Sequence, residues 1–154
     1  MNKIDLSYTA GIIDGEGCIT IEKHKNSGNQ ANVSGYTYVL QVSVLMANKW
    51  ICYWLQEGFE GNVRRHVYRT QKHCEQWRWR VCSKLAYNFL IKIKPYLKLK
   101  QDQAELGLRF QKKKSSRHYG RYNPKTKIET QQEMSNYEEI KRLHHVGLEE
   151  YNGN

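Results

Sequence analysis

Apolar and polar positions alternate along four short stretches of the chain, and this two-residue period is typical of half-buried β-strands. The alternation predicts strands over residues 18–24, 36–44, 62–69 and 75–81. A long polar stretch separates the first two strands and predicts a loop over residues 26–34. The last two strands are joined by a predicted turn over residues 70–73, so each pair of strands is expected to run antiparallel.

Apolar residues recur with a helical period in the segments between these strands and after them. Ser7 is a suitable N-cap for a first, short helix, which Gly15 and Gly17 are expected to break. Further helices are predicted over residues 48–57, 83–93 and 97–111. The residues Ser135-Asn136-Tyr137-Glu138 form a capping box that predicts a final helix ending near residue 145.

The predicted order is helix, strand, strand, helix, strand, strand, helix, and it favours an α+β fold. The four strands would form an antiparallel sheet covered by helices on one face. A chain of 154 residues fits a single domain. We expect residues 1–111 to form the core, and residues 112–154 to form a basic arm and a C-terminal helix, either within the same domain or as an extension of it.

The composition narrows the class of partner. A net charge of +10, together with eleven tyrosines and four tryptophans, favours a polyanion, most often a nucleic acid, over an anionic membrane surface. No apolar run approaches the length of a membrane span, and residues 1–6 do not form a signal peptide. The four cysteines lack the spacing of a zinc site and indicate reduced thiols. We therefore expect an intracellular protein, in a bacterial or phage-infected cytoplasm or an organelle, with neither a membrane nor a small-molecule substrate as partner.

The most informative segment covers residues 9–17, Thr-Ala-Gly-Ile-Ile-Asp-Gly-Glu-Gly. Glu16 is expected just beyond a helix C-terminus, where the helix dipole makes a carboxylate unfavourable. A divalent cation bound there would remove this penalty, with the carboxylate of Glu16 and the backbone of Gly15 as predicted ligands. The alternative is an acidic turn with no chemical role.

This nonapeptide resembles the LAGLIDADG motif of homing endonucleases. Ala10, Gly11, Asp14 and Gly17 are identical to the pattern, and Glu16 stands for its final acid. The resemblance extends over the predicted elements from residue 7 to residue 111. It implies the LAGLIDADG fold, metal-dependent double-strand cleavage of a long, partly palindromic DNA target, and Glu16 as the ligand of the catalytic metal. Asp14 is expected to be structural, accepting hydrogen bonds from the amides of the turn that follows it.

The motif occurs once in the chain, whereas cutting two strands requires two sites of attack. A homodimer supplies the second site, and the resemblance implies that the motif helices of two subunits pack together. The small residues Ala10 and Gly11 would allow their close approach. Phosphate and carboxylate oxygens favour Mg²⁺ as the metal. The short length of the chain suits a free-standing or intron-encoded enzyme.

A second segment, residues 95–101, resembles the part of single-motif LAGLIDADG enzymes that carries a lysine near the active site. The matching residue is Lys100, and the resemblance implies that it organises the attacking water and offsets charge on the phosphate. The alternative is an exposed lysine at a helix start. Some relatives hold a water with a glutamine where this chain has Val44. Either Ser43, Asn48 or Lys49 is expected to replace that function, or the water network differs.

Polar side chains on the strands are expected to occupy the sheet face that the helices leave free. Arginine can donate two hydrogen bonds to guanine and glutamine can pair with adenine, so this face is suited to reading base edges in the major groove. The alternative is a solvated basic surface. The predicted base-reading residues are Thr20, Glu22, His24, Thr37, Gln41, Ser43, Arg64, His66, Tyr68, Gln76, Arg78 and Arg80. The predicted phosphate contacts are Lys112, Lys113, Lys114, Arg117 and Arg121.

Three functions therefore compete at this level. The leading hypothesis is a site-specific, Mg²⁺-dependent DNA endonuclease. The second is a non-cutting nucleic-acid binder of the same fold, such as an RNA-splicing maturase. The third is an unrelated basic structural protein, such as a ribosomal or nucleoid component.

Overall fold

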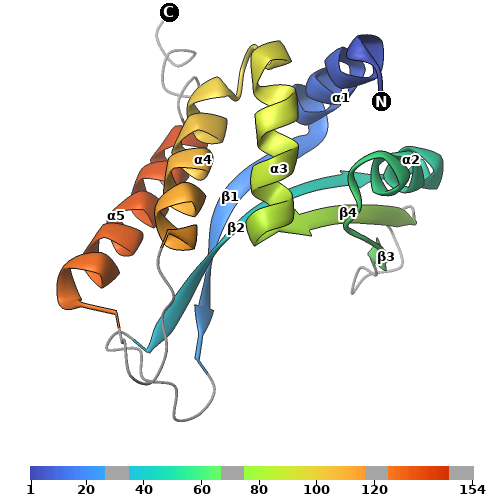
Figure 1. Ribbon diagram of the computed structural model, residues 1–154. Coiled ribbons are helices and arrows are strands. Elements are labelled where there is room, and N and C mark those ends of the chain that lie inside the picture. The colour runs from blue at the N-terminus through green and yellow to red at the C-terminus, as the bar shows by residue number, and fades with distance from the viewer. Residues whose placement is uncertain (27–34, 67–74, 117–124, 146–154) are drawn as a thin grey trace, which may run out of the picture.

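The computed structural model describes residues 1–26, 35–66, 75–116 and 125–145 (Figure 1). Helices and strands follow one another in the predicted order, including the final helix, and only a short 3₁₀ turn is added. The elements are α1 (Lys3–Glu16), β1 (Gly17–Lys25), β2 (Tyr36–Met46), α2 (Lys49–Phe59), β3 (Asn62–His66), β4 (Gln76–Cys82), α3 (Ser83–Ile93), η1 (Lys94–Tyr96), α4 (Gln101–Ser115) and α5 (Lys127–Leu143). The α+β prediction is confirmed.

The strands form one antiparallel sheet in the order β1-β2-β4-β3. Ile19 pairs with Val42 and Val42 pairs with Val81, which places these three side chains on the same face, where all are buried. The helices pack on this face (Figure 1). The register directs the alternate side chains to the other face, which we call the open face because none of the described helices covers it (Figure 1).

The helical layer lies close to the sheet at α4. Gly107 faces Leu40 of β2 and Leu90 of α3, and a Cβ atom at Gly107 would lie 2.8 Å from Leu40 Cδ1. The core also includes Trp79 and Phe89, whose rings meet edge to face with centroids 5.1 Å apart. Gly107 therefore allows α4 to approach the sheet closely, while the large Trp79 and Phe89 rings fill the space between the sheet and α3.

Several helix ends differ from the sequence prediction. Helix α1 begins at Lys3, behind a capping box formed by Asn2 and Asp5. Ser7 is inside this helix and its hydroxyl donates to the Lys3 carbonyl, so Ser7 is not the N-cap. Gly15 is also helical and does not end the helix, because glycine disfavours a helix by only about 1 kcal/mol and does not forbid it.

The other helix starts were also shifted. Helix α3 has Cys82 rather than Ser83 at its N-cap, and no side chain makes the cap hydrogen bond. Helix α4 begins at Gln101, four residues later than predicted, because residues 94–100 form a 3₁₀ turn and a bend. The last helix, α5, opens at a capping box of Thr126 and Glu129. Ser135 therefore lies in mid-helix, and the prediction of a capping box there was wrong.

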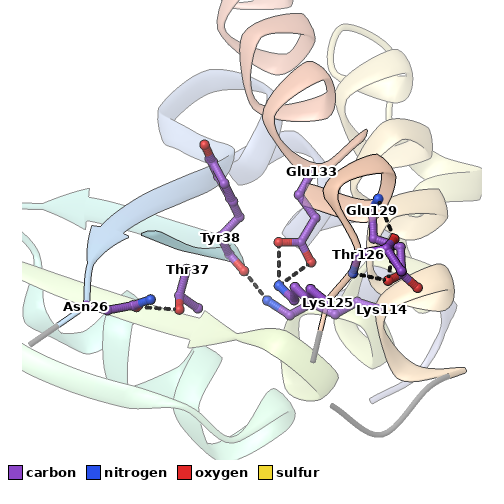
Figure 2. Close-up of polar contacts among 8 residues, drawn as sticks. All are labelled: Asn26, Thr37, Tyr38, Lys114, Lys125, Thr126, Glu129 and Glu133. Carbon is purple, nitrogen blue, oxygen red and sulfur yellow. Dashed lines mark hydrogen bonds and ion pairs between the residues drawn. The ribbon is translucent and has the colours of Figure 1, made fainter. Parts of the chain in front are cut away.

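Lysines that the sequence placed in a basic arm make contacts in the region of α4, α5 and β2 (Figure 2). Lys125 Nζ lies 2.7 and 2.6 Å from the two carboxylate oxygens of Glu133, and the two side chains are only 6% and 11% exposed. Lys114 Nζ donates to the carbonyl of Tyr38 on β2. The predicted arm is thus partly a packed helix pair, while residues 117–124 lie outside the described part of the chain. Within the described residues, no helix combines the length and apolar character needed to cross a membrane.

Candidate functional site

The junction between α1 and β1 holds Glu16 in an exposed position at the last residue of the helix. Gly17 follows as the C-cap, and its N–H donates to the carbonyls of Ile12 and Ile13. A Cβ atom at Gly17 would lie 2.7 Å from Ile13 Cα, so only glycine allows the chain to turn into β1 this tightly. The carboxylate of Glu16 is therefore presented where the helix ends and the sheet begins.

The side chain of Lys100 lies against the C-terminal end of α1. Its Nζ atom donates to the carbonyls of Ile13, Asp14 and Gly17, each at 2.8 Å. Burial lowers the pKa of Lys100, and the nearby Asp14 carboxylate opposes this shift. A cation at this position offsets the partial negative charge of the helix end. The sequence anticipated Lys100 near Glu16 but not this contact with the helix carbonyls, which joins residues more than 80 positions apart.

Asp14 fixes the same segment from the other side. Its carboxylate oxygens accept hydrogen bonds from the Lys98 amide at 2.7 Å and the Lys100 amide at 3.1 Å. Asp14 is structural, as predicted, but the amides that it binds belong to residues 98–100 and not to the turn after α1. Together, Asp14 and Lys100 lock the bend before α4 against the end of the motif helix.

Few metal-ligating groups lie near the end of α1. Gly15 and Glu16 are both exposed at the helix end. Among the described residues, no three side chains of His, Cys, Asp or Glu gather into a cluster that could hold a metal ion. A carboxylate and a backbone carbonyl are suitable oxygen donors for Mg²⁺, which usually completes its shell with water and substrate phosphates. Glu16 and the Gly15 carbonyl therefore have the chemistry of Mg²⁺ ligands, but by themselves they would fill only part of its shell.

Val44, which stands where some relatives have a water-binding glutamine, lies in an apolar environment. Val44 is fully buried and pairs with Gly17 on the helix-covered face. Of the suggested replacements, Ser43 lies on the open face opposite Cys18, whereas Asn48 caps α2 by accepting from the Trp50 amide at 2.9 Å. Lys49 is the exposed first residue of α2. Ser43 is thus the replacement that shares a face with the DNA-reading candidates.

The open face collects the predicted base-reading residues that the structure describes. The strand register brings Thr20 opposite Gln41, Ser43 opposite Arg80, and Arg64 opposite Arg78. The remaining described members are Glu22, His24, Thr37, His66 and Gln76, whereas Tyr68 lies outside the described residues.

The β3–β4 half of the open face is hollowed and basic. A hollow of about 200 Å³ is lined by Asn62, Arg64, Arg65, His66, Arg78 and Arg80. Asn62 was missed by the sequence analysis, although it precedes Arg64 by two positions and so shares its face. Arg64, Arg78 and Arg80 belong to the open face, whereas Arg65 pairs with Trp77 on the other face of the edge strand β3. A concave surface lined by arginines is suited to a polyanion.

The β1–β2 half is instead a network of side chains. Gln41 Nε2 donates to Glu22 Oε1 at 2.6 Å, and Cys82 Sγ lies 3.7 Å from Gln41 Oε1. His24 Nε2 lies 3.2 Å from the other oxygen of Glu22. Thr37 donates to Asn26 Oδ1 at 2.6 Å. Several predicted base readers are therefore already engaged with one another.

The lysines predicted to contact phosphate do not lie on the open face. Lys112, Lys113 and Lys114 belong to the last turn of α4, which packs on the opposite side of the sheet. Lys114 is held at the Tyr38 carbonyl, and burial lowers its pKa. These side chains therefore belong to the helical layer. Arg117 and Arg121 lie outside the described residues.

Ala10 and Gly11, the two residues predicted to pack the motif helices of two subunits together, differ in exposure. Ala10 is fully buried in the core, so its prediction as an interface residue was wrong. Gly11 is exposed, and a Cβ atom there would meet no atom within 4 Å; the same holds for Gly15. Ile4 and Tyr8 complete an exposed strip at helical spacing. Beside it, Trp54 meets the Tyr8 ring edge to face at 5.6 Å and stacks on the exposed Trp50.

The fold and this helix-end carboxylate agree with comparisons to known proteins. A family model described as LAGLIDADG endonuclease matches residues 9–103, which is more than half of the chain. The chain belongs to the LAGLIDADG endonuclease family. No curated protein sequence matches it significantly.

Solved structures show the same fold at low sequence identity. The homing endonuclease I-CvuI, crystallised with DNA, aligns with a TM-score of 0.73 and 20% identity over 92% of this chain and 82% of its own. The archaeal intron-encoded homing endonuclease I-Vdi141I, complexed with DNA, aligns with a TM-score of 0.71 and 13% identity over 91% and 84%. I-SmaMI bound to cleaved DNA aligns with a TM-score of 0.64 and 17% identity, over 91% of this chain but 42% of that one.

Proposed function

We propose that this protein is a site-specific homing endonuclease that uses Mg²⁺ to make double-strand breaks in a long, partly palindromic DNA target. The observation that carries the proposal is the exposed carboxylate of Glu16, held by Gly17 at the end of the motif helix and at the start of the sheet. A carboxylate at the C-terminus of a helix is electrostatically unfavourable. The Lys100 ammonium offsets part of this cost, and a divalent cation bound by the exposed carboxylate would offset more of it.

The residues of this chain would divide the work of the reaction. Glu16 and the Gly15 backbone would hold the cation, which supplies phosphate polarisation and a bound water of lowered pKa. Asp14 and Lys100 keep the helix end and the 98–100 segment in fixed relation, so that the carboxylate does not shift when DNA arrives. The arginines of the β3–β4 hollow would bind the DNA.

The proposed partner is double-stranded DNA, because the open face has the chemistry and the shape for it. I-CvuI and I-Vdi141I, which share the fold, were crystallised in complexes with DNA. This face carries Arg64, Arg78 and Arg80 beside neutral hydrogen-bonding side chains. This mixture suits a surface that both neutralises phosphate and reads base edges.

The active form would be a homodimer. This chain covers only 42% of I-SmaMI, so one copy provides less than half of that scaffold. The strip Ile4, Tyr8, Gly11 and Gly15 is exposed, partly apolar and free of bulky side chains at its two glycines. Two α1 helices packed along this strip would bring both Glu16 residues to one axis, which gives one attack site per DNA strand.

The test is cleavage of a random-sequence duplex library by the purified protein and by Glu16→Gln. The parent is expected to cut a defined sequence in Mg²⁺ and to stop cutting when EDTA removes the metal. Glu16→Gln is expected to lose at least 100-fold in cleavage rate while it retains DNA binding. Glu57→Gln, which removes an exposed carboxylate on α2, serves as the matched control and should cut normally. Selective binding by the parent without any cleavage in Mg²⁺ would contradict the endonuclease and support a non-cutting binder of the same fold.

A further inference from the structure

Gln41 is the most enclosed polar side chain of the open face. It is 6% exposed, although its strand register directs it toward the side proposed to meet DNA. Its amide contacts polar groups at both ends, since Nε2 donates to Glu22 at 2.6 Å and Oε1 lies 3.7 Å from the Cys82 thiol. These two contacts agree on one orientation of the amide. An amide that is enclosed and engaged in this way cannot reach a base edge.

Glu22 has the opposite character. Its side chain is 34% exposed on the open face, and it uses one oxygen to accept from Gln41 and the other to face His24 Nε2 at 3.2 Å. A carboxylate has about four acceptor positions, so two such contacts leave capacity for a further donor. Gln41 and His24 approach it from neighbouring positions on β2 and β1, and together they hold the carboxylate in a fixed orientation.

We propose that Glu22 is a base-reading residue that accepts a hydrogen bond from the exocyclic amino group of a cytosine, and that Gln41 is a positioning residue acting through it. This inference rests on the proposed function. It reverses the expectation that Gln41 reads adenine. The structure makes the glutamine a support and the carboxylate the reader, on a face otherwise dominated by arginine.

The chemistry of the major groove favours cytosine over the other bases. Cytosine presents an N4 amino donor, whereas guanine presents two acceptors and thymine an acceptor and a methyl group. Adenine also has an amino group, but its neighbouring N7 acceptor would lie against the carboxylate. An anionic acceptor therefore selects cytosine and repels guanine most strongly, while the arginines of the β3–β4 half favour guanine.

The experiment selects bound sequences from a randomised duplex library, with cleavage suppressed, for the parent chain and for Glu22→Gln, Gln41→Leu and the double variant. The parent is expected to require cytosine at one position of each half-site. Glu22→Gln should lower the preference for cytosine over adenine there by about tenfold, within the range for one good base contact. Gln41→Leu should weaken discrimination at the same position and at no other. The double variant should be no less selective there than Glu22→Gln alone, because both residues act through one contact.

Gln131→Leu on α5, which removes an exposed glutamine far from the open face in the fold, is the matched control and should leave the selected sequence unchanged. Thermal unfolding followed by circular dichroism shows whether each variant is still folded, so that a change in base preference is not confused with a loss of structure. If Gln41→Leu alters a different position from Glu22→Gln, Gln41 reads its own base and the proposal is wrong. An unchanged consensus with Glu22→Gln also overturns it, while the proposed function survives. If the parent selects no consensus at all, both the inference and the proposed function fail.

Discussion

Lys100 illustrates how one side chain can serve two parts of the molecule. Its ammonium donates to three carbonyls at the end of α1, while its own amide is bound by Asp14 of that helix. The resemblance to the family implied a role in organising the attacking water. The structure shows a helix-capping role in addition, because all three N–H groups of the ammonium can be accounted for by backbone carbonyls.

We therefore predict that Lys100→Met lowers the stability of the fold as well as any DNA cleavage. Methionine keeps the length of the side chain but leaves three carbonyls of the helix end without their donor. The loss should be on the order of 2–3 kcal/mol, the range for hydrogen bonds to a charged group. Urea unfolding measures it.

Lys98→Met is the control, since the Lys98 amide donates to Asp14 while its exposed side chain makes no hydrogen bond or ion pair within the described part of the chain. This variant should stay within about 0.5 kcal/mol of the parent. Full stability of Lys100→Met, combined with loss of cleavage, would mean that the lysine acts on the reaction alone.

At the scale of elements, helix α5 lies outside the residues matched by the family model, yet it packs against α4, β1 and β2 and carries a buried ion pair. The pair Lys125–Glu133 is almost completely buried, and Lys114 reaches the backbone of β2 beside it (Figure 2). Apolar contacts also hold the helix, with Ile140 buried and the Tyr137 ring 5.6 Å from that of Tyr38. The final helix thus packs on the core through both polar and apolar contacts.

We predict that Lys125→Met destabilises the protein by about 3–5 kcal/mol, because it leaves the Glu133 carboxylate buried without a partner. The double variant Lys125→Met/Glu133→Leu should recover most of this loss, because it removes both charges. Chemical denaturation of the three proteins provides the measurement. Lys141→Ala breaks an exposed pair on the same helix and should change stability by less than about 1 kcal/mol. A double variant as unstable as the single one would show that the pair contributes more than charge compensation.

At the scale of the whole molecule, the two faces of α1 have different roles. Ala10 and Ile13 are buried against the subunit's own core, whereas Gly11, Gly15 and Tyr8 are exposed. The exposed strip continues into Trp54 and Trp50 of α2. Exposed aromatic rings beside a glycine-lined helix form the surface on which we expect the second subunit to bind.

We predict that Gly11→Ala makes the isolated subunit more stable and the dimer weaker. The added methyl group meets nothing within 4 Å in the subunit, and alanine is favoured over glycine in a helix by about 1 kcal/mol. In a closely packed dimer the same methyl group would separate the two helices. Sedimentation equilibrium should show at least a tenfold rise in the dimer dissociation constant. Urea unfolding at low protein concentration should show the higher stability of the isolated subunit.

Gly17→Ala provides the contrast, because its Cβ would lie 2.7 Å from the Ile13 backbone and should destabilise the subunit itself. A Gly11→Ala protein that gains stability with no change in its association would show that the dimer forms through another surface.

Local patterns in the sequence were sufficient for the order of elements and for the two faces of the sheet. A strand has a period of two residues, so alternation alone sorted Arg78 and Arg80 from Trp77 and Trp79, and the register confirmed it. The spacing of the nonapeptide likewise placed Glu16 at a helix end. Helix starts were less predictable, because both 126–129 and 135–138 have the pattern of a capping box and only the first begins a helix.

The contacts that complete the site depended on the tertiary structure. Asp14 meets Lys100 across 86 positions, and Gln41 lies beside Cys82 across 41, so no local pattern contains either pair. Which side of α1 is buried was decided by α3 and β2, which enclose Ala10's side of the helix and leave Gly11 outside. The sequence by itself determined the secondary structure and its faces through short-range sterics and periodicity. The partner of each polar side chain was decided by packing, because it depends on which distant segments the folded chain brings within hydrogen-bonding distance.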